Sequence, residues 1–348
     1  MKRFLTAMLM LCLLCGFAFG EEVRVFTDST GRVIELPTKI GCVAVSGTMA
    51  QIMVFALAPE TLCGVADHWT DAARGIIAEE YLRLPVLGQL YGGKGNMNLE
   101  TLLATEPDVL IDVGEKKDGV AAEMDAMEAQ IGIPCAHIDV DLNGIPEAFR
   151  MLGELLDRRE DAEALAAYAE DTLRQTREIA EKVEKTRILY VVGSEGRSVI
   201  ARDSYHSAVL DLLGENVAVV EAPSAKGTGN EVDMEQILVW NPDFVIFAPD
   251  GIYDKVGEKA NWRTISAIQS GRYAEVPNAP YNWMGFPPSV QRLLGMKWLA
   301  KLLYPQAADY DLYEEARMFF DLFYHCDLTR EMFDEITAKS AALKEGWN

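Results

Sequence analysis

The sequence predicts an α/β protein of two Rossmann-like lobes with central parallel sheets, joined by a long rigid helix that leaves a ligand cleft between the lobes. Three features predict this fold. Short apolar runs alternate with helical stretches in both halves, one segment occurs twice, and an Ala/Glu/Leu/Arg-rich stretch separates the halves. We therefore predict a signal peptide at residues 1–20, an N-terminal lobe at 21–145, a connecting helix at 146–185 and a C-terminal lobe at 186–348.

The amino-terminal segment has the order of an export signal. Two positive residues precede the apolar run 4–14, and small residues surround the predicted cleavage position after Gly20. The run is too short to span a membrane comfortably. Cys12 and Cys15 both follow a leucine, whereas a lipid-attachment cysteine follows a small residue. We expect an exported, periplasmic protein rather than a lipoprotein.

Each half of the remaining chain alternates strands with helices. In the first half we expect strands at 42–45, 63–66, 109–113 and 136–140, and helices at 48–57, 99–104 and 120–131. In the second half we expect strands at 188–192, 217–220 and 244–247, and helices at 205–213, 234–239 and 289–304. This alternation predicts parallel sheets that are covered on both faces.

The repeated segment indicates that the two lobes are built alike. Residues 98–111 (NLETLLATEPDVLI) match residues 233–246 (DMEQILVWNPDFVI) at a constant offset of 135 residues. In each copy an Asn or Asp can cap a helix whose first turn carries a glutamate. A Pro-Asp pair then ends the helix, and an apolar run short enough for a buried strand follows.

The stretch between the halves predicts a stiff connection. Residues 146–185 contain one glycine, Gly153, and no proline after Pro146, which is typical of one long helix or two helices in series. Because this stretch is no flexible linker, we expect only a small movement of the lobes when ligand binds.

Composition and motifs exclude several functions. The chain has 32 Lys+Arg against 54 Asp+Glu and a formal net charge of −22, so it lacks the basic footprint needed for nucleic acid or an anionic membrane. No HExxH, GxSxG or GxxxxGK[ST] motif occurs, and we do not expect an enzyme.

The cysteines that follow the predicted signal peptide are Cys42, Cys63, Cys135 and Cys326. The first three open predicted strands, where a buried thiol packs as a small apolar side chain, so we expect free core thiols. In an exported protein Cys42 and Cys63 could instead form a disulfide, and the sequence does not decide between the two states.

These features together resemble the exported substrate-binding proteins of ABC transporters that carry ferric siderophores, vitamin B12 and related complexes. The resemblance rests on residues 26–32 (FTDSTGR), residues 57–65 (LAPETLCGV), both copies of the repeat, and residues 261–273 (NWRTISAIQSGRY). It implies a solute-binding component of an ABC importer, which captures an iron complex such as a ferric siderophore and delivers it to a permease and its ATPase.

The resemblance also implies a role for one glutamate on each lobe. Glu100 and Glu235 fall where family members dock onto arginines of the permease. Both are equally favourable as first-turn helix charges, and the two roles are compatible.

We expect the ligand site in loops at the carboxyl ends of the strands, facing across the cleft. The candidate ligand-binding residues in these loops are Ser46, Thr48, His68, Trp69, Tyr91, Arg197, Arg202, Tyr205, His206, Asn230, Trp283 and Arg292. The aromatic members among them would form apolar walls with polar tips.

The three candidate arginines favour an anionic ligand, because they would create a local positive field on an acidic protein. A ferric catecholate or an oxyanion such as molybdate or tungstate meets that description. Residues 283–295 (WMGFPPSVQRLLG) look like a family branch that includes oxyanion binders. Ser289 and Arg292 would lie in the first turn of the next helix, where anions are favoured.

Histidine use argues against a bare metal ion as the ligand. His68 and His206 are the histidines of predicted cleft loops, and they are too few for a divalent-metal site. Haem stays open, with His68, His206, Tyr205 or Tyr91 as axial ligand. We expect a monomer without a cofactor. The sequence does not decide whether the ligand is an iron complex, cobalamin, haem or an oxyanion. A receptor that senses a ligand without transporting it is the alternative to a transport function.

Overall fold

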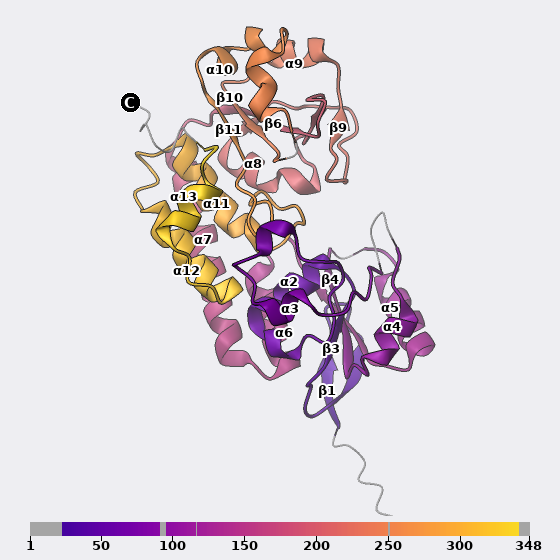
Figure 1. The fold of residues 1–348 in the computed structure, drawn as a ribbon. Helices are drawn as coiled ribbons and strands as arrows, with labels where there is room; N and C mark the ends of the chain where they lie inside the picture. Colours follow the sequence, from indigo (N-terminus) through magenta and orange to yellow (C-terminus); the bar gives the residue numbers. More distant parts are fainter. Residues whose placement is uncertain (1–22, 91–94, 116, 250, 341–348) are drawn as a thin grey trace, which may run out of the picture.

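The computed structural model describes residues 23–90, 95–115, 117–249 and 251–340. It consists of two α/β lobes, one above the other in Figure 1, joined along one side by helices. The fold class predicted from the sequence is confirmed. The predicted signal peptide lies outside the described residues. Within those described, no helix is both long and apolar enough to cross a membrane.

The first lobe contains a hairpin and a parallel sheet. Its strands are β1 (Val23–Thr27), β2 (Val33–Pro37), β3 (Val43–Val45), β4 (Val109–Gly114) and β5 (Cys135–Asp139), and its helices are α2 (Thr48–Leu57), α3 (Glu79–Leu82), α4 (Leu99–Ala104) and α5 (Val120–Ile131). Strands β1 and β2 pair antiparallel, while the sheet order β3-β4-β5 is parallel throughout. The predicted strand 63–66 is present only as isolated bridges at Leu62 and Val65.

Alternate residues of this sheet bury opposite faces. Val43, Val45 and Ile111 belong to the main core with α2, whereas Ala44 and Leu110 belong to a second core with residues of α4 and α5. The period of two is what a strand imposes, so the sheet is covered on both faces as predicted.

The second lobe has a mixed sheet. Its strands are β6 (Arg187–Val192), β7 (Ser198–Val199), β8 (Glu215–Asn216), β9 (Asn230–Glu231), β10 (Phe244–Phe247) and β11 (Tyr273–Glu275), and its helices include α8 (Ala208–Leu213), α9 (Met234–Trp240) and α10 (Ser266–Gln269). Strands β6, β8, β10 and β11 are parallel, but β7 pairs antiparallel with both β6 and β9. The prediction of a purely parallel sheet is therefore wrong for this lobe. A short loop after β6 is enough for an antiparallel return, and two-residue strands leave no sequence pattern.

The internal repeat is confirmed as one structural unit that occurs in both lobes. Helix α4 leads into β4, and α9 leads into β10. In each copy the aspartate after the proline donates its backbone N–H to the chain that opens the neighbouring strand. The distance is 2.8 Å from Asp108 N to Cys42 O, and 2.8 Å from Asp243 N to Arg187 O.

The connection between the lobes is a helix pair rather than a single helix. Helices α6 (Ile145–Leu156) and α7 (Arg159–Lys182) are separated at Asp157, whose φ of 55° is left-handed. The pair is antiparallel, because Arg150 of α6 reaches both Glu163 and Glu170 of α7 at 2.8 Å. The predicted connecting helix 146–185 therefore folds back on itself, and only α7 continues to the second lobe.

The last three helices make the joint broad. They are α11 (Gln291–Leu303), α12 (Leu312–Tyr324) and α13 (Arg330–Ile336). Helix α11 packs on α7 and α8, while α12 returns to pack on α2 of the first lobe. The buried Lys297 Nζ lies 3.0 Å from a carboxylate oxygen of Glu315 and donates to Gln175 at 2.6 Å, which ties α11, α12 and α7 together.

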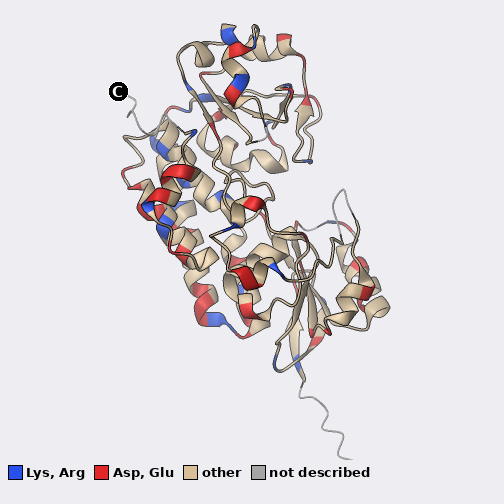
Figure 2. Cartoon of the chain, in the orientation of Figure 1, with Lys and Arg blue, Asp and Glu red and all other residues tan. Residues whose placement is uncertain are grey.

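The main apolar core runs without interruption from α2 and α6 through α7 and α12 to α8 and α11. A shared core of this kind resists rotation of one lobe against the other. Charged groups are spread over both lobes and the joining helices, and do not gather in one region (Figure 2).

Candidate ligand-binding site

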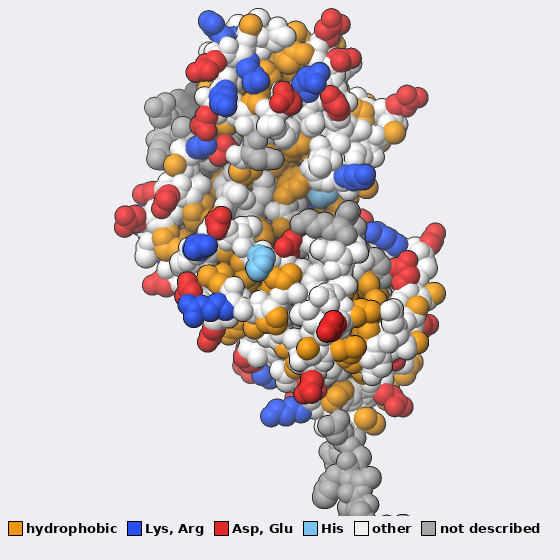
Figure 3. Space-filling model, turned by 45° about the vertical axis from the view of Figure 1, so that its right-hand side comes forward, with side chains coloured by type: hydrophobic (Ala, Val, Ile, Leu, Met, Phe, Trp, Pro, Cys, Tyr) orange, Lys and Arg blue, Asp and Glu red, His pale blue; other side chains and the backbone are white. Residues whose placement is uncertain are grey.

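The two lobes meet at the carboxyl ends of the first-lobe strands, and Figure 3 shows a notch between the lobes. A gap of about 10 Å³ remains between them, which holds about one water molecule. It is lined by Met49, Met53, Val140, Asp141 and Ile145 from the first lobe and the adjoining α6, and by Tyr205, Pro288, Ser289, Val290 and Arg292 from the second. This meeting point joins the predicted cleft loops of both lobes, and we call it the lobe contact.

Arg292 is the charged centre of the second-lobe side. The side chain is buried at the start of α11, and its guanidinium lies 4.5 Å from the centre of the Tyr205 ring. Its Nη2 donates to the Tyr205 carbonyl oxygen at 3.1 Å. Burial lowers the pKa of the Arg292 guanidinium, although the charges of Glu115 and Asp141 oppose this. Among the ion pairs of the described residues, none includes Arg292.

His206 lies beside this arginine and is packed against an aromatic ring. Its ring stacks on Phe286 at a centroid distance of 4.8 Å and an angle of 9°. Burial and the charge of Arg292 together lower the pKa of His206 to about 4. The imidazole is therefore neutral at neutral pH, which leaves Arg292 as the positive group at the lobe contact.

The first-lobe side is the beginning of α2. Its N-cap is Gly47, no side chain caps the first turn, and no acidic residue lies in that turn. The amide groups of a helix start carry a partial positive charge, so this turn favours an anion. Thr48 is the first residue of α2 and Met49, the second, lines the lobe contact.

A buried polar network holds the turn that precedes α2. The Ser46 hydroxyl donates to Asp112, and the other carboxylate oxygen of Asp112 lies 2.6 Å from Nδ1 of His137. All three side chains are buried. The Ser46 hydroxyl, predicted as a ligand group, is therefore engaged in positioning the loop.

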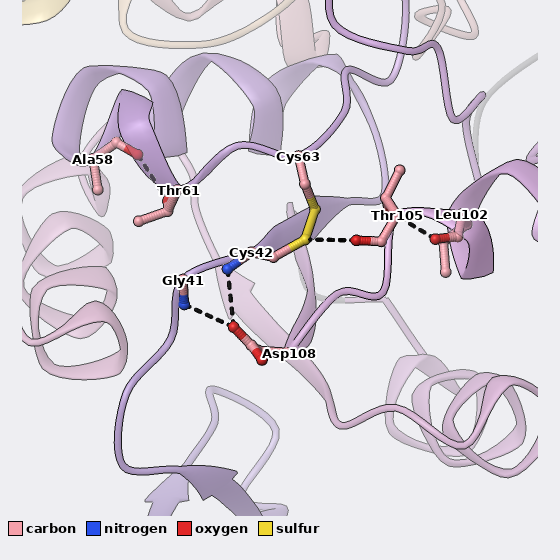
Figure 4. The surroundings of a disulfide bond; sticks show 8 residues. All are labelled: Gly41, Cys42, Ala58, Thr61, Cys63, Leu102, Thr105 and Asp108. Carbon is pink, nitrogen blue, oxygen red and sulfur yellow. Dashed lines mark hydrogen bonds between the residues drawn. A yellow bond between two sulfur atoms is a disulfide. The ribbon is translucent and has the colours of Figure 1, made fainter.

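The disulfide Cys42–Cys63 stabilises the same lobe from the opposite end of its strands (Figure 4). It cross-links the start of β3 to the segment that leads to Asp67, while the Asp108 carboxylate accepts the Cys42 amide at 2.9 Å. The expectation of free thiols is wrong for this pair. A parallel bridge between Val43 and Leu62 brings the segments that carry Cys42 and Cys63 side by side. Cys135 and Cys326 are free and buried, as predicted.

Two of the predicted aromatic walls are core residues instead. Trp69 is buried and donates its indole N–H to the Tyr81 carbonyl at 3.1 Å. Trp283 is fully buried and donates to the Ala279 carbonyl at 3.0 Å. The Trp69 indole is therefore held by α3, and the Trp283 indole by its own loop.

Three predicted polar ligands serve the second lobe itself. The Asn230 amide accepts from Ser224 N and donates to Ala222 O, each at 2.8 Å, which holds its own loop together. Arg202 donates to the Asn216 carbonyl at 2.7 Å, and Arg197 pairs with Glu231 at 3.2 Å. Their hydrogen-bonding capacity is directed away from the lobe contact.

The remaining candidates give no metal site. His68 is exposed on its loop, and Tyr91 lies outside the described residues. Over the ranges that the structure covers, no group of three or more His, Cys, Asp or Glu side chains is placed to hold a metal ion.

A larger cavity of about 530 Å³ opens in the second lobe beside Phe286. It is lined by Val192, Gly193, Ser194, Glu195, Ser198, Gly227, Thr228, Ala248, Pro249, Asn278, Asn282 and Phe286. Its volume suits a small organic ligand. Its one charged lining residue is an acid, which disfavours an anionic ligand.

The predicted docking glutamates occupy equivalent places. Glu100 and Glu235 are both exposed in the first turns of α4 and α9. Only the α4 cap forms a side-chain bond, in which Asn98 accepts the Thr101 amide at 3.1 Å.

Several residues of the site were missed from the sequence. Asp112 and His137 each interrupt an apolar strand, and that pattern could have paired them. Phe286 and Asp141 carried no signal, because an aromatic or acidic residue in a loop is ordinary.

Known proteins are similar over nearly the whole chain. The model of the periplasmic binding protein family matches residues 78–280. The molybdate-binding protein MolA of Haemophilus influenzae is 26% identical, over 92% of this chain and 96% of that one. An ABC transporter solute binding protein from Sulfurospirillum deleyianum is 29% identical with a TM-score of 0.82, covering 90% of this chain and 99% of that one. The structure of MolA bound to molybdate has the same fold, with 20% identity and a TM-score of 0.72 over 88% of this chain and 99% of that one.

Proposed function

Because this chain belongs to the periplasmic binding protein family, we propose that it captures a small oxyanion of the molybdate and tungstate class at the lobe contact and delivers it to an ABC permease. The observation that carries the proposal is Arg292. A buried guanidinium is costly without a counter-charge, and no carboxylate forms an ion pair with it among the described residues. A bound oxyanion would supply that charge.

The two sides of the contact supply complementary donors. The guanidinium offers planar, charge-assisted hydrogen bonds, and the uncapped first turn of α2 offers backbone amides. The gap is nearly closed, so the anion enters by displacing the Arg292 guanidinium from the Tyr205 carbonyl. This local change is compatible with the broad joint between the lobes.

The similarity to the molybdate-binding protein of Haemophilus influenzae supports this ligand class. An iron complex such as a ferric siderophore remains the second candidate, because the 530 Å³ cavity beside Phe286 would accept part of a bulky chelate. Cobalamin and haem would need the same cavity. Glu195 at its wall disfavours a ferric catecholate, which is strongly anionic.

The remaining steps of import are part of the proposal. Residues 1–20 act as a cleaved signal peptide, and the mature lobes span residues 21–145 and 186–348. Glu100 and Glu235 then dock on basic residues of the permease. Replacing both with alanine leaves ligand affinity unchanged and abolishes uptake.

Calorimetric titration of the purified mature protein separates the ligands. Molybdate and tungstate should bind, whereas a ferric catecholate, cobalamin and haem should not. Arg292→Gln should weaken oxyanion binding by about 100-fold, since a buried charge-assisted contact contributes about 3 kcal/mol. Arg202→Gln is the matched control and should bind normally, because Arg202 is directed to Asn216. Equal affinity of the two variants would refute the assignment, and circular dichroism checks that both are folded.

A further inference from the structure

The repeated helices α4 and α9 show the same pattern of exposed apolar residues beside the docking glutamates. On α4, Leu103 is 45% exposed; on α9, Leu238 is 36% exposed and Val239 is 78% exposed. Leu238 occupies the position of Leu103 in the repeat. Exposed aliphatic side chains of this size are uncommon on the described surface, and these three belong to the repeated unit.

Helical spacing places these residues next to the glutamates. Leu103 is three residues after Glu100, and Leu238 and Val239 are three and four residues after Glu235. Side chains at these spacings share one helix face. Each lobe therefore presents a carboxylate bordered by aliphatic groups, and we call these faces the α4 face and the α9 face. Both helices lie away from α7, α11 and α12, so neither face is covered by the joint (Figure 1).

The two faces are unequal. At the fourth position after the glutamate, α4 carries Ala104 whereas α9 carries Val239. A groove of about 560 Å³ also adjoins α9, on the side of Gln236 and Trp240 rather than on the α9 face, and Val219 on its wall is 58% exposed. Glu221, Glu231 and Asp233 line the same groove, so its charged lining residues are all acidic.

We propose that the permease docks through both faces by apolar contact as well as by charge, and that the α9 face is the stronger anchor. This inference rests on the proposed importer function. The occupant is a permease surface with two similar sites, each with a basic side chain framed by aliphatic ones. The duplicated acid-plus-aliphatic pattern argues for two similar sites, and the exposed glutamate on each face argues for their positive charge.

The unequal faces predict unequal losses on substitution. Leu238→Ser/Val239→Ser should raise the concentration of binding protein needed for half-maximal ATPase stimulation by about tenfold, and Leu103→Ser by about threefold. Met318→Ser is the matched control, because Met318 is 44% exposed on α12 and belongs to neither face. It should change nothing.

The test measures ATP hydrolysis by permease–ATPase complexes from the same organism, reconstituted in liposomes, and uses the complex with the strongest response to the wild-type protein. Titration with oxyanion confirms that each variant binds ligand normally. If the α9 pair behaves like Met318→Ser, or if Leu103→Ser costs more than the α9 pair, the inference is refuted. If Glu100→Gln/Glu235→Gln loses ATPase stimulation while the aliphatic variants keep it, the proposed importer function stands and the apolar contact is refuted. Failure of the wild-type protein to stimulate any such complex would contradict both.

Discussion

The two lobes share one helix–strand unit but are stabilised differently. The first lobe has an all-parallel sheet held by a disulfide and by the buried Ser46–Asp112–His137 network. The second has a mixed sheet, and its side of the site depends on aromatic packing around Arg292 and His206. The comparison indicates that the first lobe is a fixed support and the second supplies the charge.

Loss of the Asp112 carboxylate is expected to give the largest effect in this comparison. Asp112→Ala leaves a buried hydroxyl and a buried imidazole without their acceptor. The free energy of unfolding should fall by about 3–5 kcal/mol. Urea unfolding measures it, with Asp112→Asn as the variant that retains an acceptor for Ser46. A loss below about 1 kcal/mol would show that the network does not support the first lobe.

Removal of the disulfide tests the covalent support of the same lobe. The bridge closes a loop with a sequence separation of 21 residues. Cys42→Ser/Cys63→Ser should therefore reduce the free energy of unfolding by about 3 kcal/mol. Wild-type protein with reductant should unfold at the same denaturant concentration as the double variant. If reductant has no effect on wild-type unfolding, the bridge does not contribute.

Acid should weaken the second lobe through His206. Burial and Arg292 lower its pKa from 6.5 to about 4, so between these values the unfolded chain binds more protons there than the folded protein. The free energy of unfolding should rise with pH across this window, by about 3 kcal/mol in total, and the gain should be lost as the pH falls below 6.5. His206→Gln should flatten this slope, and His68→Gln, at an exposed position, should not. Equal slopes in the two variants would contradict the shift.

The helix caps of the repeat give the smallest difference. Asn98 bonds the first turn of α4, whereas the Asp233 side chain makes no such bond to α9. Asn98→Ala should cost about 1 kcal/mol, and Asp233→Ala less than about 0.5 kcal/mol, from its charge at the helix start. Thermal unfolding of the pair measures both. A larger loss for Asp233→Ala would mean that the two copies are capped alike in solution.

Much of the fold could be predicted because the periodic pattern of apolar residues ends at the same positions as the capping and helix-breaking residues. Helices 48–57, 99–104 and 120–131 have the predicted bounds, since residues such as Asn98 and Gly132 mark their ends. The break at Asp157 could not be predicted, because nothing in a Leu-Leu-Asp-Arg sequence marks a left-handed residue. The pairing of β7 with β9 was missed because strands of two residues cannot show a period.

The site was harder to predict than the fold. Arg292 and Tyr205 were candidates from the sequence, and the structure brings them into contact at the lobe contact. Trp69 and Trp283 are buried, and the sequence could not decide their place because an indole suits a core and a cleft wall equally. The disulfide required knowledge of which strands are neighbours, which spacing alone does not contain.

The position of the bound oxyanion tests the central claim most directly. Crystals of the mature protein soaked with tungstate should show an anomalous scattering peak at the lobe contact, within hydrogen-bond distance of the Arg292 guanidinium and beside the first turn of α2. A peak in the cavity beside Ser194 and Phe286, or no peak in either place, would contradict the account.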